Sequence, residues 1–142
     1  MAWLALVLLP VAAALWARTR LRVVEVRGTS MNPTYADGDR LLVRRGPART
    51  GRPVVFRRPD RLGADVDWLV KRAVATAGQP VPPPFAGTLG DRVVPAGRLL
   101  VRGDNPISVD SRHFGYVAEA DVLGTPIRRL SIGVGEPRRA LR

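Results

Sequence analysis

The chain has 142 residues, of which 46% are hydrophobic and 25% charged, with 14 glycines and 13 prolines. This length fits one domain of ordinary size and argues against a two-domain enzyme. Cysteine is absent and His113 is the single histidine, which excludes disulfides, thiolate metal sites and cysteine nucleophiles and disfavours a zinc site of several imidazoles. We therefore expect no metal and no cofactor.

The basic residues are distributed unevenly between the two types. The formal net charge of +11 points to nucleic acid or an anionic membrane surface as a partner. Of the 23 basic residues only one, Lys71, is a lysine. Arginine keeps its charge in proteins, whereas a desolvated lysine can act as a base. Either Lys71 is a lysine by chance in a composition biased toward arginine, or its position needs a side chain that arginine cannot replace.

Residues 1–17 contain no charged side chain, and as a helix they would span about 25 Å, the short end of a membrane span. Trp3 and Trp16 bracket this stretch as interfacial residues do. We predict a transmembrane anchor at 1–17 and a basic juxtamembrane segment at 18–22. A cleaved secretory signal is the alternative, although the segment lacks a basic n-region.

The rest of the chain has the short apolar runs that are typical of strands. Gly-Asp pairs and a proline-rich stretch at 80–84 separate these runs, and none of the chain beyond the N-terminal segment keeps a helical period over ten residues. The runs lie at 21–26, 40–45, 52–58, 67–74, 98–103, 116–124 and 126–132. We predict an all-β fold, a small antiparallel β-barrel or sandwich over residues 23–130, followed by a flexible basic tail at 131–142.

Ser30 lies in the sequence GTSMNPT, directly after a predicted strand. Gly28 permits unusual backbone angles there, and Asn32 with Pro33 favours a turn. A serine at such a strand tip would present its hydroxyl as a nucleophile and its own N–H to an oxyanion. The alternative is a polar turn without a chemical role.

Lys71 lies in DWLVKRAV, and in a strand it would share one face with Leu69 and Ala73. Apolar surroundings disfavour the ammonium form and lower the pKa of a lysine from about 10.4, which would make a neutral amine available as a base. A solvated lysine on an edge strand is the alternative. A serine hydroxyl activated by a neutral lysine amine is a recognised catalytic dyad.

Four motifs together resemble the type I signal peptidases. In chain order they are SMNPT from Ser30, GDRLLVRR from Gly38, KRAVATAGQ from Lys71 and GDNPISVDSRHFG from Gly103. With the apolar segment before them, they follow the order and spacing of that family over about residues 1–130. The last motif is the most specific of the four.

The resemblance implies a role for each matching residue. Ser30 matches the nucleophile and Lys71 the general base. The supporting positions are Ser108, which would orient the lysine amine, the salt-bridged Asp110 and Arg112, and the loop residues Gly103, Asp104 and Asn105. We assign the oxyanion turn to Gly28 and Ser30, and substrate contacts to Met31 and Pro33.

The resemblance further implies a membrane-anchored serine endopeptidase that cleaves signal or leader peptides from exported precursors through an acyl-enzyme. Its partners would be these precursors and the lipid bilayer, not nucleic acid, and its catalytic domain would be extracytoplasmic. The positive-inside rule, applied to residues 18–22, would instead hold this flank in the cytoplasm. Three alternatives are a non-enzymatic arginine-rich β module that binds anionic lipid or phosphate-bearing partners, a Ser-His-Asp hydrolase using Ser30, His113 and Asp104 or Asp110, and a self-cleaving repressor. The last also uses a Ser-Lys dyad but has a DNA-binding N-terminus, where this chain has an apolar segment.

Overall fold

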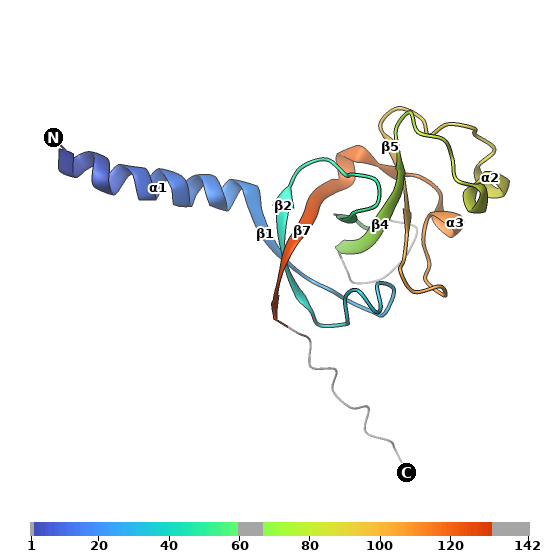
Figure 1. The fold of residues 1–142 in the computed structure, drawn as a ribbon, viewed down its shortest axis with the longest axis horizontal. Helices are drawn as coiled ribbons and strands as arrows, with labels where there is room; N and C mark the ends of the chain where they lie inside the picture. Colours follow the sequence, from blue (N-terminus) through green and yellow to red (C-terminus); the bar gives the residue numbers. More distant parts are fainter. Residues whose placement is uncertain (1, 60–66, 132–142) are drawn as a thin grey trace, which may run out of the picture.

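The computed structural model describes residues 2–59 and 67–131. Helix α1 (Ala2–Arg20) leads directly into strand β1 (Leu21–Glu25), so the helix includes the first part of the predicted juxtamembrane segment. Figure 1 shows α1 extending away from the rest of the chain. Among the described residues, no helix combines the length and apolar character that a membrane crossing requires. The predicted span at 1–17 is therefore not confirmed.

The all-β prediction is confirmed, because the described chain beyond α1 is built around one curled antiparallel sheet (Figure 1). Its strand order is β1-β2-β7-β3-β4-β5-β6. The remaining strands are β2 (Arg40–Arg45), β3 (Pro53–Arg57), β4 (Trp68–Thr76), β5 (Arg98–Arg102), β6 (Val117–Ala118) and β7 (Val122–Ser131). The sheet curls on itself instead of forming two packed sheets.

The last strand differs from the prediction of separate runs at 116–124 and 126–132. After β6 and a 3-10 turn at Glu119–Asp121, β7 continues through Pro126 to Ser131. Proline is tolerated at this point because the described pairing of β3 with β7 ends at Gly124, and the β2 register shifts beside Pro126. The other residues of the predicted tail, 132–142, lie outside the described residues.

Two short helices were not predicted. Helix α2 (Pro83–Leu89) begins in the proline-rich stretch at 80–84, which was expected only to separate strands. Prolines fit the first turn of a helix. Its Phe85 is buried, and Gly90 ends it in a left-handed conformation with φ of 73°. Helix α3 (Ser111–Phe114) is a single turn capped by Asp110.

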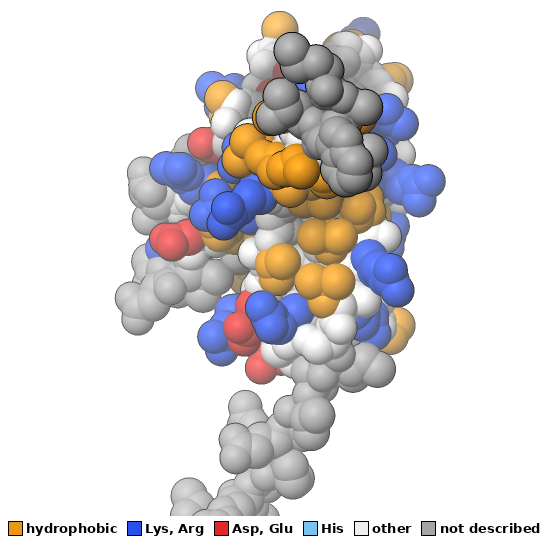
Figure 2. All heavy atoms as spheres, turned by 90° about the vertical axis from the view of Figure 1, so that its left-hand side faces the viewer, with side chains coloured by type: hydrophobic (Ala, Val, Ile, Leu, Met, Phe, Trp, Pro, Cys, Tyr) orange, Lys and Arg blue, Asp and Glu red, His pale blue; other side chains and the backbone are white. Residues whose placement is uncertain are grey.

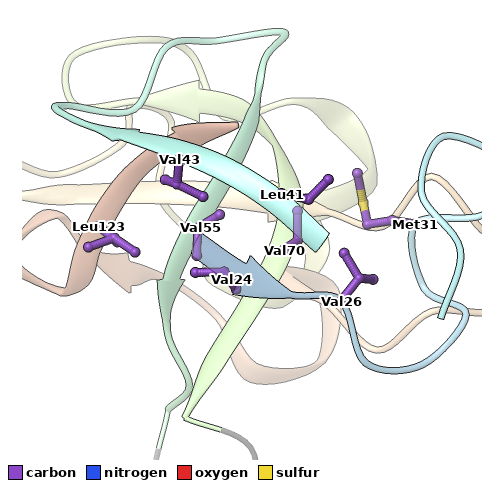
Figure 3. Close-up of a cluster of buried hydrophobic side chains, with 8 residues drawn as sticks. All are labelled: Val24, Val26, Met31, Leu41, Val43, Val55, Val70 and Leu123. Atoms are coloured by element: carbon purple, nitrogen blue, oxygen red, sulfur yellow. The ribbon is translucent and has the colours of Figure 1, made fainter. Parts of the chain in front are cut away.

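Three groups of buried side chains lie against the sheet. The first cluster, drawn in Figure 3, contains Val24, Val26, Met31, Leu41, Val43, Val55, Val70 and Leu123. The second contains Val54, Phe56, Ala73, Leu99, Val101, Phe114 and Val117, and the third contains Ala75, Phe85, Val94 and Leu100. Neighbouring residues of β3, Val54 and Val55, belong to different clusters, so this strand is covered on both faces. Such burial makes the centre of the sheet a rigid base for side chains that emerge at its end.

Candidate active site

Ser30 lies in a turn that is anchored at several points. Gly28 has φ of 83°, one of the unusual backbone angles that a glycine permits, and its N–H donates to the Asp37 carboxylate. The Asn32 N–H donates to the Thr29 carbonyl at 3.0 Å. The Met31 side chain is buried in the first cluster, while Ser30 is half-buried. The turn is thus held by the core on one side and leaves Ser30 beside the surface.

The loop after β5 binds directly to this turn. The backbone N–H of Asn105 donates to the Ser30 carbonyl at 3.0 Å, and the Asn105 side chain donates to the Thr29 carbonyl at 3.1 Å. A Cβ atom on Gly103 would overlap the Ser108 side chain and lie 2.6 Å from the Ser30 carbonyl oxygen. Glycine is therefore required by close packing, and segments about 75 positions apart meet here.

Lys71 is buried on β4, with 3% of its surface exposed. Lys71 lies directly opposite Val54 in the pairing of β3 with β4. Ala73 belongs to the second cluster and Leu69 packs against it, whereas Val70 belongs to the first cluster. The predicted alternation of faces along this strand therefore holds. Burial lowers the pKa of Lys71 from 10.5 to about 8, partly opposed by the negative charge of Asp110. With this pKa, about one tenth of the amine is neutral at pH 7.

Asp110 is fully buried and collects hydrogen bonds from three directions. Its carboxylate accepts from the Ser108 hydroxyl at 3.1 Å, from the Gly103 N–H at 3.1 Å and from two nitrogens of the Arg112 guanidinium at 2.9 and 2.8 Å. Burial alone would raise the pKa of Asp110, but the hydrogen bonds from Arg112 and from the Gly103 N–H outweigh it and hold the pKa below its usual value. The predicted pair of Asp110 and Arg112 is present as a charge-assisted contact.

Asp104 makes the second charged contact of the loop, with a residue that the sequence analysis did not assign. The Arg72 guanidinium binds the Asp104 carboxylate through Nε at 2.8 Å and a terminal nitrogen at 2.7 Å. Thr34 also donates to Asp104, and Arg72 reaches the Gly51 carbonyl. The hydrogen bond from Arg72 lowers the pKa of Asp104. The only sequence signal for Arg72 was its position directly after Lys71.

Some predicted contacts are not formed in this structure. Among the described residues, neither the Ser30 hydroxyl nor the Lys71 amine has a hydrogen-bond partner, and Ser108 donates to Asp110. Met31, predicted to contact substrate, is buried, whereas Pro33 is exposed. Pro33 lines a cavity of about 420 Å³ that also includes Thr34, Arg72 and Gly103.

His113 belongs to the cap of α3. Its Nδ1 accepts a hydrogen bond from the Asp110 N–H at 3.2 Å, and the Asp110 side chain caps the same turn. This contact explains the residue without a catalytic role. In the described part of the chain, no group of three or more histidine and acidic side chains is placed to hold a metal ion.

Two comparisons identify similar proteins. A family model described as signal peptidase, peptidase S26, matches residues 1–83 and 83–130. The signal peptidase I V of Bacillus subtilis (strain 168) is 30% identical over an alignment of 139 residues, which covers 70% of this chain and 80% of that protein.

Proposed function

The chain belongs to the signal peptidase family, peptidase S26, and from this membership we propose that it is a serine endopeptidase that removes signal or leader peptides from exported precursors. Ser30 is the proposed nucleophile and Lys71 the proposed general base. One observation carries this assignment: the only lysine of the chain is a buried residue, 3% exposed, and burial lowers the pKa of its amine to about 8.

The proposed reaction uses one amine for two proton transfers. Neutral Lys71 takes the hydroxyl proton of Ser30 as its Oγ attacks the scissile carbonyl carbon. The tetrahedral adduct expels the amine of the mature protein, which receives this proton from the Lys71 ammonium, and an ester to Ser30 remains. Water then loses a proton to the same amine and attacks the ester. The second adduct expels the Ser30 oxygen, which takes that proton back from the Lys71 ammonium, and the signal peptide leaves as a carboxylic acid.

The oxyanion donor in this proposal is the N–H of Ser30. Within residues 2–59 and 67–131 no acceptor pairs with this N–H, whereas the N–H of Gly28 is occupied by Asp37. Gly28 therefore serves the turn geometry through its positive φ. An N–H held in a rigid turn needs no reorganisation as negative charge develops on the substrate carbonyl.

The hydrogen bond between Ser30 and Lys71 would form when substrate binds, as catalytic contacts often tighten only in the complex. Ser108 supports this step indirectly. Its hydroxyl donates to Asp110 at 3.1 Å, which leaves its lone pairs free to accept a hydrogen bond from the Lys71 ammonium in the proposed complex. The Asp110 charge, which raises the pKa of Lys71, would stabilise that ammonium.

The precursor would lie extended along β1, which leads to the Ser30 turn. This strand is at one end of the sheet order, so its outer edge is available for backbone hydrogen bonds with a peptide. Pro33 borders the cavity of about 420 Å³ beside the turn. In this arrangement Pro33 forms an exposed wall of the substrate pocket, whereas Met31 is buried in the first cluster and does not line the cavity.

Replacement of Ser30 by alanine tests the assignment. Ser30→Ala should lower cleavage of synthetic precursor peptides by about 10³-fold or more while thermal unfolding is unchanged. Ser131→Ala, at the exposed end of β7, is the matched control and should retain full activity. Cleavage sites and rates are measured by mass spectrometry. Turnover by Ser30→Ala comparable to the control would refute the proposed nucleophile.

We further propose that α1 anchors the domain on the outer side of a membrane. The exposed apolar side chains of α1 include Val7, Leu8 and Leu9, which point in different directions around the helix. Protease added to spheroplasts should digest the β domain. Protection until the cells are lysed would place the domain in the cytoplasm and refute the role in export.

A further inference from the structure

A basic cavity lies beside the sheet, and neither Ser30 nor Lys71 lines it. It has a volume of about 600 Å³ and is bounded by the C-terminal end of α1, the connection from β2 to β3, and β7. Trp16 contributes an aromatic wall. Five arginines line the cavity: Arg20, Arg44, Arg45, Arg49 and Arg52. No described lining residue is acidic.

The five guanidinium groups are not neutralised within the described chain. The ion pairs formed there involve other basic residues: Arg27, Arg72, Arg112 and Arg129. Arg20 lies 5.9 Å from the centre of the Trp16 ring, a contact that leaves its charge uncompensated. Arg45 also lines a neighbouring cavity that contains Glu119 and Asp121. Clustered like charges repel one another, and an anion that enters the cavity relieves this repulsion.

Guanidinium groups in this arrangement favour a phosphate. Arginine presents a planar fork of N–H donors that binds two phosphate oxygens at once. Several arginines from different elements surround one volume, so a single phosphate group can contact more than one of them.

The position of the cavity distinguishes a lipid from a free phosphate. It lies where the apolar helix ends, beside exposed Leu15 and Trp16, and tryptophan is typical of the level of lipid headgroups. On the face that carries α1, Figure 2 shows an apolar area with basic side chains on both sides. We propose that this cavity binds the phosphate of an anionic phospholipid headgroup and seats the domain against the bilayer.

This inference rests on the proposed membrane anchoring and accounts for the charge conflict in the sequence. A basic flank outside the cytoplasm opposes the positive-inside rule. A lipid phosphate bound between Arg20 and the β2–β3 connection neutralises part of that flank at the outer surface. The arginines then hold the domain at a defined height above the bilayer.

Calorimetric titration of the full chain in neutral detergent micelles tests the site. The ligands are short-chain phosphatidylglycerol, short-chain phosphatidylcholine and inorganic phosphate. We expect saturable binding of phosphatidylglycerol, with the other two ligands at least about tenfold weaker. Arg44→Gln combined with Arg49→Gln should weaken that binding by about thirtyfold, as expected for two arginines at an anionic surface.

The matched control is Arg92→Gln combined with Arg98→Gln, which removes the same charge from exposed positions outside the cavity. It should bind phosphatidylglycerol like the unaltered chain, and thermal unfolding establishes that both double variants are folded. Equal weakening in both would show diffuse attraction and overturn the site. Equal affinity for inorganic phosphate would show a free-anion site and overturn the lipid assignment.

The test is separate from the proposed peptidase activity. Ser30→Ala should bind phosphatidylglycerol as the unaltered chain does, since Ser30 does not line the cavity. Lipid binding without any cleavage would refute the proposed function alone. Cleavage without saturable lipid binding would refute this inference alone.

Discussion

A change of pH perturbs the proposed dyad through Lys71, which can act as a base only as a neutral amine. Burial lowers the pKa of Lys71 from 10.5 to about 8. With that pKa, about one tenth of the amine is neutral at pH 7 and about nine tenths at pH 9. We therefore expect kcat/KM to rise about tenfold between these values and then level off. A lysine with an ordinary pKa would give a rise that continues beyond pH 10.

The assay uses an acetylated precursor peptide without histidine or lysine, so that the substrate does not titrate in this range. The α-amino group of the chain titrates near pH 8 as well. A second measurement separates the two groups: because Lys71 is the only lysine, protein labelled with ¹³C-lysine gives a single Cε resonance. The midpoint of that resonance should agree with the midpoint of the cleavage profile.

A resonance midpoint near 10.5, or a cleavage rate that does not change between pH 7 and 9, would refute the reasoning. Lys71→Arg provides the control, because it keeps the charge but has a pKa above about 12 and cannot accept the Ser30 proton. It should fold and lose cleavage by several orders of magnitude. Activity above about one tenth of the original, a loss under about 1.4 kcal/mol in the barrier, would exclude Lys71 as the base.

Two further substitutions test the packing of the site. Gly103→Ala places a methyl group against Ser108 and the Ser30 carbonyl, so we expect less cleavage and a loss of about 1–3 kcal/mol in calorimetric stability. The control Gly87→Ala has open space around it and should be neutral or slightly stabilising. Equal effects of the two substitutions would contradict the close packing of Gly103 against Ser108 and the Ser30 carbonyl. Lys71→Met should be inactive yet more stable at pH 7 by up to about 3 kcal/mol, because each pKa unit is worth about 1.4 kcal/mol and the unfolded chain binds the Lys71 proton more tightly. The free energy of unfolding of the unaltered chain should accordingly rise from about pH 8 to 10.5, where the stability advantage of Lys71→Met disappears. Urea unfolding measures both proteins, and a Lys71→Met variant that is less stable at pH 7 would contradict this.

The sequence alone determined features that depend on near neighbours in the chain. Short apolar runs predicted strands at the positions of β1 to β5, because side-chain alternation is a property of a few consecutive residues. The same alternation placed Lys71 on a face with Leu69 and Ala73. Glycine at 28 was expected to permit unusual backbone angles, and its φ is 83°, because a residue without Cβ adopts positive φ readily.

Only the tertiary structure decided which distant segments meet. In the sheet, β7 lies between β2 and β3. This order buries side chains on both faces of the sheet, and the periodicity of a single segment does not predict it. The same docking buries Met31, pairs Arg72 with Asp104, and surrounds Asp110 with donors from two sides of the loop. The pKa of Lys71 belongs to this level, because desolvation depends on everything packed around the amine once the chain has folded.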